Sequence, residues 1–139
     1  MKTALFIGRF QPFHEGHLDA VKQIFADCDK LIIAIGSSEK SGTFLNPFSG
    51  NERKKMIMKI FAKEKFLPST YEIVFVPDIH SPANWPTHVK KCVPHFDILY
   101  TGSRSVKDLF EKYSPDTKIL PIKKNIKISA TEIRKMIKK

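Results

Sequence analysis

Short apolar runs rich in β-branched residues alternate with amphipathic segments along the 139-residue sequence. The apolar runs predict strands at residues 3–7, 31–35, 72–76, 96–101 and 118–121. The intervening segments carry apolar residues at helical spacing and predict helices at residues 17–26, 49–63, 85–92, 106–113 and 129–137. Such alternation is typical of a parallel sheet with right-handed crossovers. We therefore expect a single α/β domain, residues 1–139, with a Rossmann-like parallel sheet of about five strands flanked by helices.

Ligands of such sheets bind beyond the carboxyl ends of the strands, near the point where the strand order reverses. The segments that follow the predicted strands are residues 8–16, 36–46, 77–85, 102–104 and 123–129. They hold most of the residues with reactive side chains or special backbone roles. Their grouping at one edge of the sheet indicates a protein with an active site rather than a structural protein.

The sequence GRFQPFHEGH, residues 8–17, joins the first predicted strand to the first predicted helix. Gly8 permits a sharp turn, and Gly16 lets the helix begin close to a bound group. The free amides and the positive dipole end of that helix attract anions, and the spacing of His14 and His17 lets both face one anion. Neither GxxxxGK[ST] nor GxGxxG occurs, which excludes the P-loop and dinucleotide fingerprints. The turn therefore predicts a phosphate site of another kind.

The sequence ISATEIR, residues 128–134, begins the last predicted helix. Ser129 and Thr131 suit the N-cap and the first turn, and Arg134 lies one turn further on, facing the same edge of the sheet. A simple helix cap explains the same residues and stays open as the alternative. If the block serves the phosphate site, two helix starts far apart in sequence surround one polyphosphate.

The formal net charge of +10 comes mainly from scattered lysines, which favours solvated surface over a nucleic-acid interface, with an acidic partner as the alternative. The arginines differ, because each falls near a predicted junction of a strand or loop with a helix, where a guanidinium fork suits phosphate. These arginines are Arg9, Arg53, Arg104 and Arg134. Phe10 and Phe13 are expected to anchor the first turn as apolar plugs.

Cys28 and Cys92 lie in no CxxC or Cys/His ligand spacing. They predict reduced thiols in or near the core, without a disulfide framework or a zinc site. No apolar run approaches the roughly 18 residues of a membrane span, and the first residues lack the long apolar stretch and small-residue cleavage site that are typical of a secretory leader. We expect a cytoplasmic protein with no membrane partner.

Three blocks resemble, in order, the motifs of archaeal-type nicotinamide mononucleotide adenylyltransferases of the HxGH nucleotidyltransferase superfamily. They are GRFQPFHEGH, GSSEKSGTFLNPFSGNERKKMI and ISATEIRKMI, and the similarity covers nearly the whole chain. The resemblance implies an enzyme of NAD biosynthesis that joins the adenylyl group of ATP to a mononucleotide phosphate, giving NAD and pyrophosphate. Such a nucleophile is already ionised and needs no catalytic base. Mg²⁺ would be held mainly by the substrate phosphates, with no metal ligand assigned to the protein.

The resemblance also implies the site residues. The catalytic set is Arg9, His14, His17 and Arg134. The ATP-binding set adds Gly8, Phe10, Gly102, Ser129 and Thr131. The acceptor-binding set is Gly36, Ser37, Lys40, Asn84 and Trp85, with the Trp85 ring expected to stack on the acceptor base.

Two positions depart from the family pattern: Gly42 stands where relatives often carry histidine, and Asn84 is next to Trp85 rather than a few residues ahead of it. The alternatives are therefore a same-fold enzyme using CTP with a phosphorylated alcohol, or ATP with nicotinate mononucleotide or pantetheine phosphate. A catalytically idle nucleotide sensor or nucleic-acid binder is the rival from another class. The expected partners are ATP and a phosphorylated small-molecule acceptor, without nucleic acid. A homo-oligomer stays open, because archaeal-type relatives continue into further helices that help to build theirs.

Overall fold

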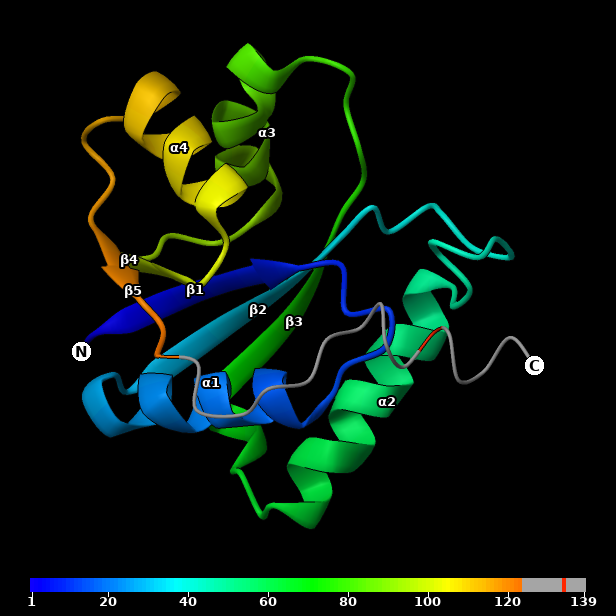
Figure 1. Cartoon of the computed structure of the whole chain (residues 1–139). Coiled ribbons are helices and arrows are strands. Elements are labelled where there is room, and N and C mark those ends of the chain that lie inside the picture. The colour runs from blue at the N-terminus through cyan, green and yellow to red at the C-terminus, as the bar shows by residue number, and fades with distance from the viewer. Residues whose placement is uncertain (124–133, 135–139) are drawn as a thin grey trace.

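A computed structural model of the protein describes residues 1–123 and Arg134 (Figure 1). Its centre is a five-stranded parallel sheet with the strand order β3-β2-β1-β4-β5. The strands are β1 (Thr3–Gly8), β2 (Lys30–Gly36), β3 (Tyr71–Val76), β4 (Ile98–Thr101) and β5 (Ile119–Pro121). The helices are α1 (Glu15–Asp27), α2 (Gly50–Lys63), α3 (Trp85–Cys92) and α4 (Arg104–Tyr113), with the short 3-10 turns η1 (Pro68–Thr70) and η2 (Pro82–Asn84).

The predicted parallel sheet is confirmed, and the described elements end within two residues of their predicted bounds. The helices α1 and α4 each begin two residues earlier than predicted, because the side chains of His14 and Ser103 cap them before their apolar periodicity starts. β4 begins later than predicted. Asp97, directly before it, still bonds to Thr3 of β1, since its amide donates to the Thr3 carbonyl and its carboxylate accepts from the Thr3 amide, at 2.8 Å each. The predicted helix at 129–137 lies outside the described residues, apart from Arg134.

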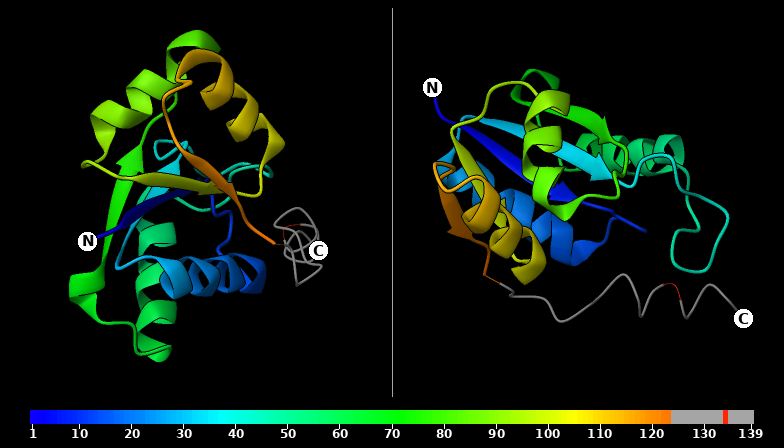
Figure 2. Two further views of the ribbon diagram at one scale, coloured as in Figure 1. Left: turned by 90° about the vertical axis from the view of Figure 1, so that its left-hand side faces the viewer. Right: turned by 90° about the horizontal axis from the view of Figure 1, so that it is seen from above.

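Helices cover both faces of the sheet, with α1 and α2 on one face and α3 and α4 on the other (Figures 1 and 2). Successive side chains of β1 point to opposite faces of the sheet. Phe6 packs in the apolar cluster on the α1 and α2 face, whereas Leu5 and Ile7 pack in the cluster on the α3 and α4 face. β2 is likewise buried on both faces. This explains why these two strands read as continuous apolar runs in the sequence.

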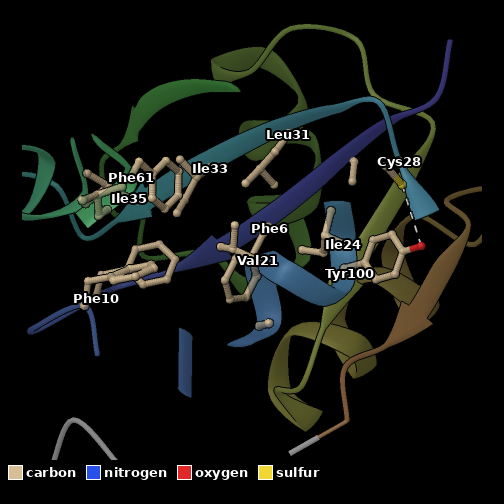
Figure 3. Close-up of a cluster of buried hydrophobic side chains, with 14 of the residues drawn as sticks. Phe6, Phe10, Val21, Ile24, Cys28, Leu31, Ile33, Ile35, Phe61 and Tyr100 are labelled. Carbon is tan, nitrogen blue, oxygen red and sulfur yellow. Dashed lines mark hydrogen bonds between the residues drawn. The ribbon is translucent and has the colours of Figure 1, made fainter. Parts of the chain in front are cut away.

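A small group of polar side chains lies at the edge of the core near the end of α1 (Figure 3). The Cys28 thiol lies 3.8 Å from the Tyr100 hydroxyl, which donates to Asp27 at 3.5 Å. Burial, with the neighbouring Cys28 and Asp27, raises the pKa of Tyr100. Cys28 and Cys92 are both free thiols, as predicted. Within residues 1–123, no helix combines the length and apolar character needed to cross a bilayer.

The strand order reverses between β1 and β4. The chain leaves β1 toward α1 on one face and leaves β4 toward α4 on the opposite face. The two loops therefore diverge at the carboxyl ends of adjacent strands, which is the place where open α/β sheets bind ligands.

Candidate active site

The turn after β1 is organised by Phe10, whose ring belongs to the core (Figure 3). Phe10 is 2% exposed with φ at 53°, and its ring meets the His17 ring edge-on with 4.9 Å between centroids. Gly8 makes room for it, because a Cβ at Gly8 would lie 3.0 Å from that ring. Phe10 and Phe13 are both buried, which agrees with their expected role as apolar anchors. Because the Phe10 ring is buried, only the backbone of Phe10 is available for the contact with ATP that the sequence predicts.

Both histidines of the turn use Nδ1 to accept a backbone hydrogen bond at the start of α1. His14 accepts from the Gly16 amide at 3.0 Å, and His17 accepts from the His14 amide at 3.1 Å, which closes a capping box. A neutral imidazole that accepts at Nδ1 carries its proton at Nε2. The rings stack with 3.7 Å between centroids. Two Nε2–H donors are therefore fixed on neighbouring rings at a helix N-terminus.

These histidines are neutral at ordinary pH. Burial lowers the pKa of His17 to about 3, and the adjacent His14 contributes to this shift. Burial also lowers the pKa of His14. Both side chains therefore offer hydrogen-bond donors to an anion, and the positive charge of the site must come from arginines.

Arg134 reaches this turn from the far end of the sequence. It is 4% exposed, and its Nη1 donates to the Gln11 carbonyl at 2.9 Å. Burial lowers the pKa of Arg134, and the positive charge of Arg9 lowers it further. Arg9 is exposed and donates to Asn46 Oδ1 at 3.2 Å. Neighbouring cations of this kind attract a polyvalent anion.

The predicted acceptor residues Ser37 and Lys40 lie in the loop after β2 and are held by Asp78, from the loop after β3. The carboxylate of Asp78 accepts from Ser37 Oγ at 2.8 Å and pairs with Lys40 Nζ at 2.9 Å. Burial alone would raise the pKa of Asp78, but hydrogen bonds from Lys40 and Ser37, with the Lys40 charge, lower it. Gly36 ends β2 directly before Ser37. These residues form one hydrogen-bonded unit at the carboxyl edge of the sheet.

The other predicted acceptor residues, Asn84 and Trp85, lie where η2 meets α3. The Trp85 ring is half-buried and packs edge-on against Phe110 of α4, with 5.6 Å between centroids. The Asn84 side chain is exposed and donates to Ser81 Oγ at 2.8 Å. Trp85 thus contributes to the core on the α3 and α4 face, whatever further contact it makes. Gly102 is exposed directly after β4, beside the switch point.

The expectation that all the arginines face phosphate is wrong for two of them. Arg53 is completely buried and donates to backbone carbonyl groups, including those of Arg9 and Gly36 at 2.8 Å each. Arg104 projects into solvent, with a side chain 93% exposed and a loose ion pair to Asp108 at 3.8 Å. The sequence correctly predicts that both arginines lie near a helix start, but it does not reveal the direction of their guanidinium groups. Ser129 and Thr131 lie outside the described residues.

Sequence reasoning missed two residues that build the site, Gln11 and Asp78, and gave Arg53 the wrong role. The Gln11 side chain, 1% exposed, forms a two-way pair with the backbone of Phe48, donating to its carbonyl and accepting its amide at 2.9 Å each. Asp78 could have been found from the sequence, because it is an acidic residue in the loop that follows a predicted strand. Among residues 1–123 and Arg134, no group of three or more histidine, cysteine or carboxylate side chains could hold a metal ion.

Comparison with known proteins shows which family of proteins the chain resembles. A family model described as cytidylyltransferase-like matches residues 5–136. The nicotinamide-nucleotide adenylyltransferase of Thermococcus kodakarensis is 38% identical over 97% of this chain and 72% of its own length. The enzyme of that name from Methanococcus aeolicus is 42% identical over 96% of this chain and 76% of its own length.

A solved structure extends the comparison to the fold. The bifunctional NMN adenylyltransferase/ADP ribose pyrophosphatase of Francisella tularensis superposes with a TM-score of 0.84 and 26% identity over 97% of this chain. This chain spans 41% of that bifunctional protein, which has also been solved with AMP and a manganese ion. The chain therefore belongs to the cytidylyltransferase-like family, and within it to the family of the nicotinamide-nucleotide adenylyltransferases.

Proposed function

We propose that the protein transfers the adenylyl group of ATP to the phosphate of nicotinamide mononucleotide, giving NAD and pyrophosphate, in the cytoplasm. The observation that carries the proposal is the stacked pair His14 and His17, with both Nδ1 atoms committed to backbone amides and both Nε2–H groups left as donors. Two neutral donors at a helix N-terminus suit a phosphate that must be held without being neutralised. The names of the relatives support the choice of substrates.

The reaction needs positioning and charge stabilisation more than acid–base chemistry. An ionised phosphate oxygen of the mononucleotide attacks the α-phosphorus of ATP, a new P–O bond forms, and the bond to the bridging oxygen of the β-phosphate breaks. The electron pair of that bond leaves with pyrophosphate, so no proton has to be moved by the protein. His14 and His17 would donate to the oxygens on the α-phosphorus, where negative charge develops in the transition state.

Arg9 and Arg134 would bind the β- and γ-phosphates of ATP. The positive charge of Arg9 lowers the pKa of Arg134, and a polyanion bound by both guanidinium groups would offset this repulsion. Magnesium would arrive as the Mg–ATP substrate, bound by phosphate oxygens and water. We propose Gly8, the Phe10 backbone, Gly102, Ser129 and Thr131 as the remaining ATP contacts.

The acceptor would bind across the unit formed by Gly36, Ser37 and Lys40, beside Asn84 and Trp85. Lys40 is ion-paired to Asp78 yet partly exposed, so its ammonium can turn to the acceptor phosphate while Asp78 keeps its place. The free edge or face of the Trp85 ring would receive the pyridine base. These acceptor-binding residues would determine whether the enzyme selects nicotinamide mononucleotide or one of the alternative acceptors.

A substrate panel tests the proposal. Pyrophosphate release is measured with ATP or CTP against nicotinamide mononucleotide, nicotinate mononucleotide, pantetheine phosphate and a phosphorylated alcohol, and the products are identified by mass. We expect the highest kcat/KM for ATP with nicotinamide mononucleotide, with NAD as the product. Preference for CTP or for another acceptor would replace the proposed substrates by those of a same-fold enzyme. No pyrophosphate with any pair would favour the nucleotide-sensor alternative.

A further inference from the structure

Arg53 is a buried cation whose guanidinium is surrounded by backbone carbonyl groups. It lies in the first turn of α2 with no exposed surface. Its Nε donates to the Ser49 carbonyl at 3.1 Å, and its Nη2 donates to the carbonyls of Ser37 at 3.0 Å and Lys40 at 3.2 Å. Within the described residues, no carboxylate forms a salt bridge with it. A buried charge is costly unless it is fully hydrogen-bonded, so this arrangement calls for a role beyond filling space.

One atom of this guanidinium joins the two halves of the proposed site. Nη1 of Arg53 donates to the Arg9 carbonyl and to the Gly36 carbonyl, at 2.8 Å each. The first carbonyl belongs to the turn of the proposed ATP site, and the second to the loop of the proposed acceptor site. The separation of the two loops is therefore set by a rigid planar group that is itself fixed on α2.

The backbone next to both carbonyls is strained. Phe10, which follows Arg9, has φ at 53°, and Ser37, which follows Gly36, has φ at 49°. A positive φ is unfavourable for residues with a side chain and persists where surrounding bonds impose it. Arg53 binds the carbonyl that precedes each of these residues, so its hydrogen bonds help to hold both loops in these conformations.

The loop after β2 also lies unusually close to α2. A Cβ at Gly50, the first residue of α2, would lie 2.7 Å from the Ser38 carbonyl oxygen. Gly50 thus lets the acceptor loop approach the helix that carries Arg53. A second link, the two-way pair between Gln11 and Phe48, joins the same two loops independently of Arg53.

We propose that Arg53 is a positioning residue that fixes the distance between the ATP-binding and acceptor-binding loops, so that the attacking phosphate oxygen and the α-phosphorus are held in line. This inference rests on the proposed function. In-line displacement depends steeply on this distance, and a misplacement of about 1 Å can cost about 100-fold in rate. Each substrate contacts only one of the loops, so loss of the link should lower kcat far more than it weakens either substrate alone.

The test compares Arg53→Lys with Leu99→Ala. Lysine keeps the charge but cannot reach both carbonyls from one planar group. Leu99 lies in β4, is fully buried and belongs to the apolar cluster on the opposite face of the sheet, so its variant controls for lost stability. The measurements are kcat and KM from pyrophosphate release, binding of each substrate alone, and amide hydrogen exchange of residues 8–14 and 36–46, all well below the lowest Tm.

We expect Arg53→Lys to lose about 100-fold in kcat with each separate substrate affinity within a few-fold of wild type, and to exchange faster in both loops together. Leu99→Ala should lower Tm and leave these quantities unchanged. Normal kcat in folded Arg53→Lys, or faster exchange in neither loop or only one, would overturn the proposal. If wild type makes no NAD but both loops loosen together in Arg53→Lys, the proposed function fails while the link between the loops stands.

A second variant covers the case in which Arg53→Lys does not fold. Gly50→Ala leaves Arg53 intact but pushes the Ser38 carbonyl away from α2. We expect faster exchange in residues 36–46 and a lower kcat, with ATP affinity unchanged. A folded Gly50→Ala protein with wild-type kcat would show that the spacing of the acceptor loop does not matter, and would overturn the proposal.

Discussion

His17 accepts the backbone amide of His14 at 3.1 Å through Nδ1 while its ring stacks on the His14 ring with 3.7 Å between centroids. The bond fixes the tautomer and the stacking fixes the ring plane, so the Nε2–H of His17 has one direction. Donors that are oriented before the substrate arrives need no reorganisation in the transition state, which is where such groups contribute most.

Replacing His17 separates its two roles. His17→Ala should lower kcat by about 10²–10³, the usual cost of one preorganised donor. His17→Gln can still accept the His14 amide, as glutamine does at this position of a capping box, and should keep a near-wild-type Tm while its kcat falls as well. Pyrophosphate release and thermal melting are measured on both variants. Wild-type turnover in folded His17→Ala would refute the assigned role.

Stability should depend on pH through His17. Its folded pKa is about 3 and its unfolded pKa is near the ordinary value of 6.5, so between these values the unfolded chain binds more protons. The stabilising contribution is therefore complete above about pH 6.5 and is lost as pH falls toward 3. Urea unfolding at pH 7.5 and 4.5 should show wild type losing on the order of 1–3 kcal/mol more than His17→Gln. Equal losses would show that His17 titrates normally in the folded protein.

Trp85→Ala tests whether the ring does more than cover the core. A lost stacking contact with the acceptor base should raise the acceptor KM roughly tenfold to a hundredfold and leave the KM of ATP unchanged. Tm should also fall, because the ring packs on Phe110. Val89→Ala, one turn along α3 in the same cluster, is the matched control that lowers Tm alone. A lower Tm with both KM values unchanged would make Trp85 purely a core residue.

Arg134 tests whether the two ends of the sequence serve one phosphate group. Arg134→Ala should weaken the use of ATP strongly, and Arg134→Lys should keep partial activity, because lysine retains the charge but loses the guanidinium fork. Combining Arg134→Ala with His17→Ala should give a loss in kcat/KM clearly smaller than the product of the single losses. Strictly multiplicative losses, measured by pyrophosphate release, would mean that the two residues act independently.

The fold could be predicted from the sequence because it depends on local patterns. Strands buried on both faces leave uninterrupted apolar runs, as at β1 and β2, and covering helices leave a 3.6-residue period. The prediction that Gly8, His14 and His17 form a phosphate turn rests on the same kind of local pattern, since their proposed roles depend on neighbours within ten positions.

The remaining part of the candidate site depends on partners that are distant in sequence. Arg53 and Arg9 look alike as charged residues near helix starts, yet one is buried among carbonyls and the other is exposed. The pairing of Gln11 with Phe48 and of Asp78 with Lys40 joins different loops, and no periodicity or spacing encodes such contacts. Burial and direction of a polar side chain are properties of the packed structure, so these residues were missed or misassigned.

The ring of Phe10 links the packing of the hydrophobic core to the position of His17, a residue of the proposed active site. It fits over Gly8 and meets the edge of the His17 ring, so apolar contacts set the resting position of an imidazole that we propose binds phosphate. Engineering this protein for heat tolerance by refilling the interior between β1 and α1 would therefore shift its turnover as well. Stabilising changes are better sought on the α3 and α4 side of the sheet, away from Trp85.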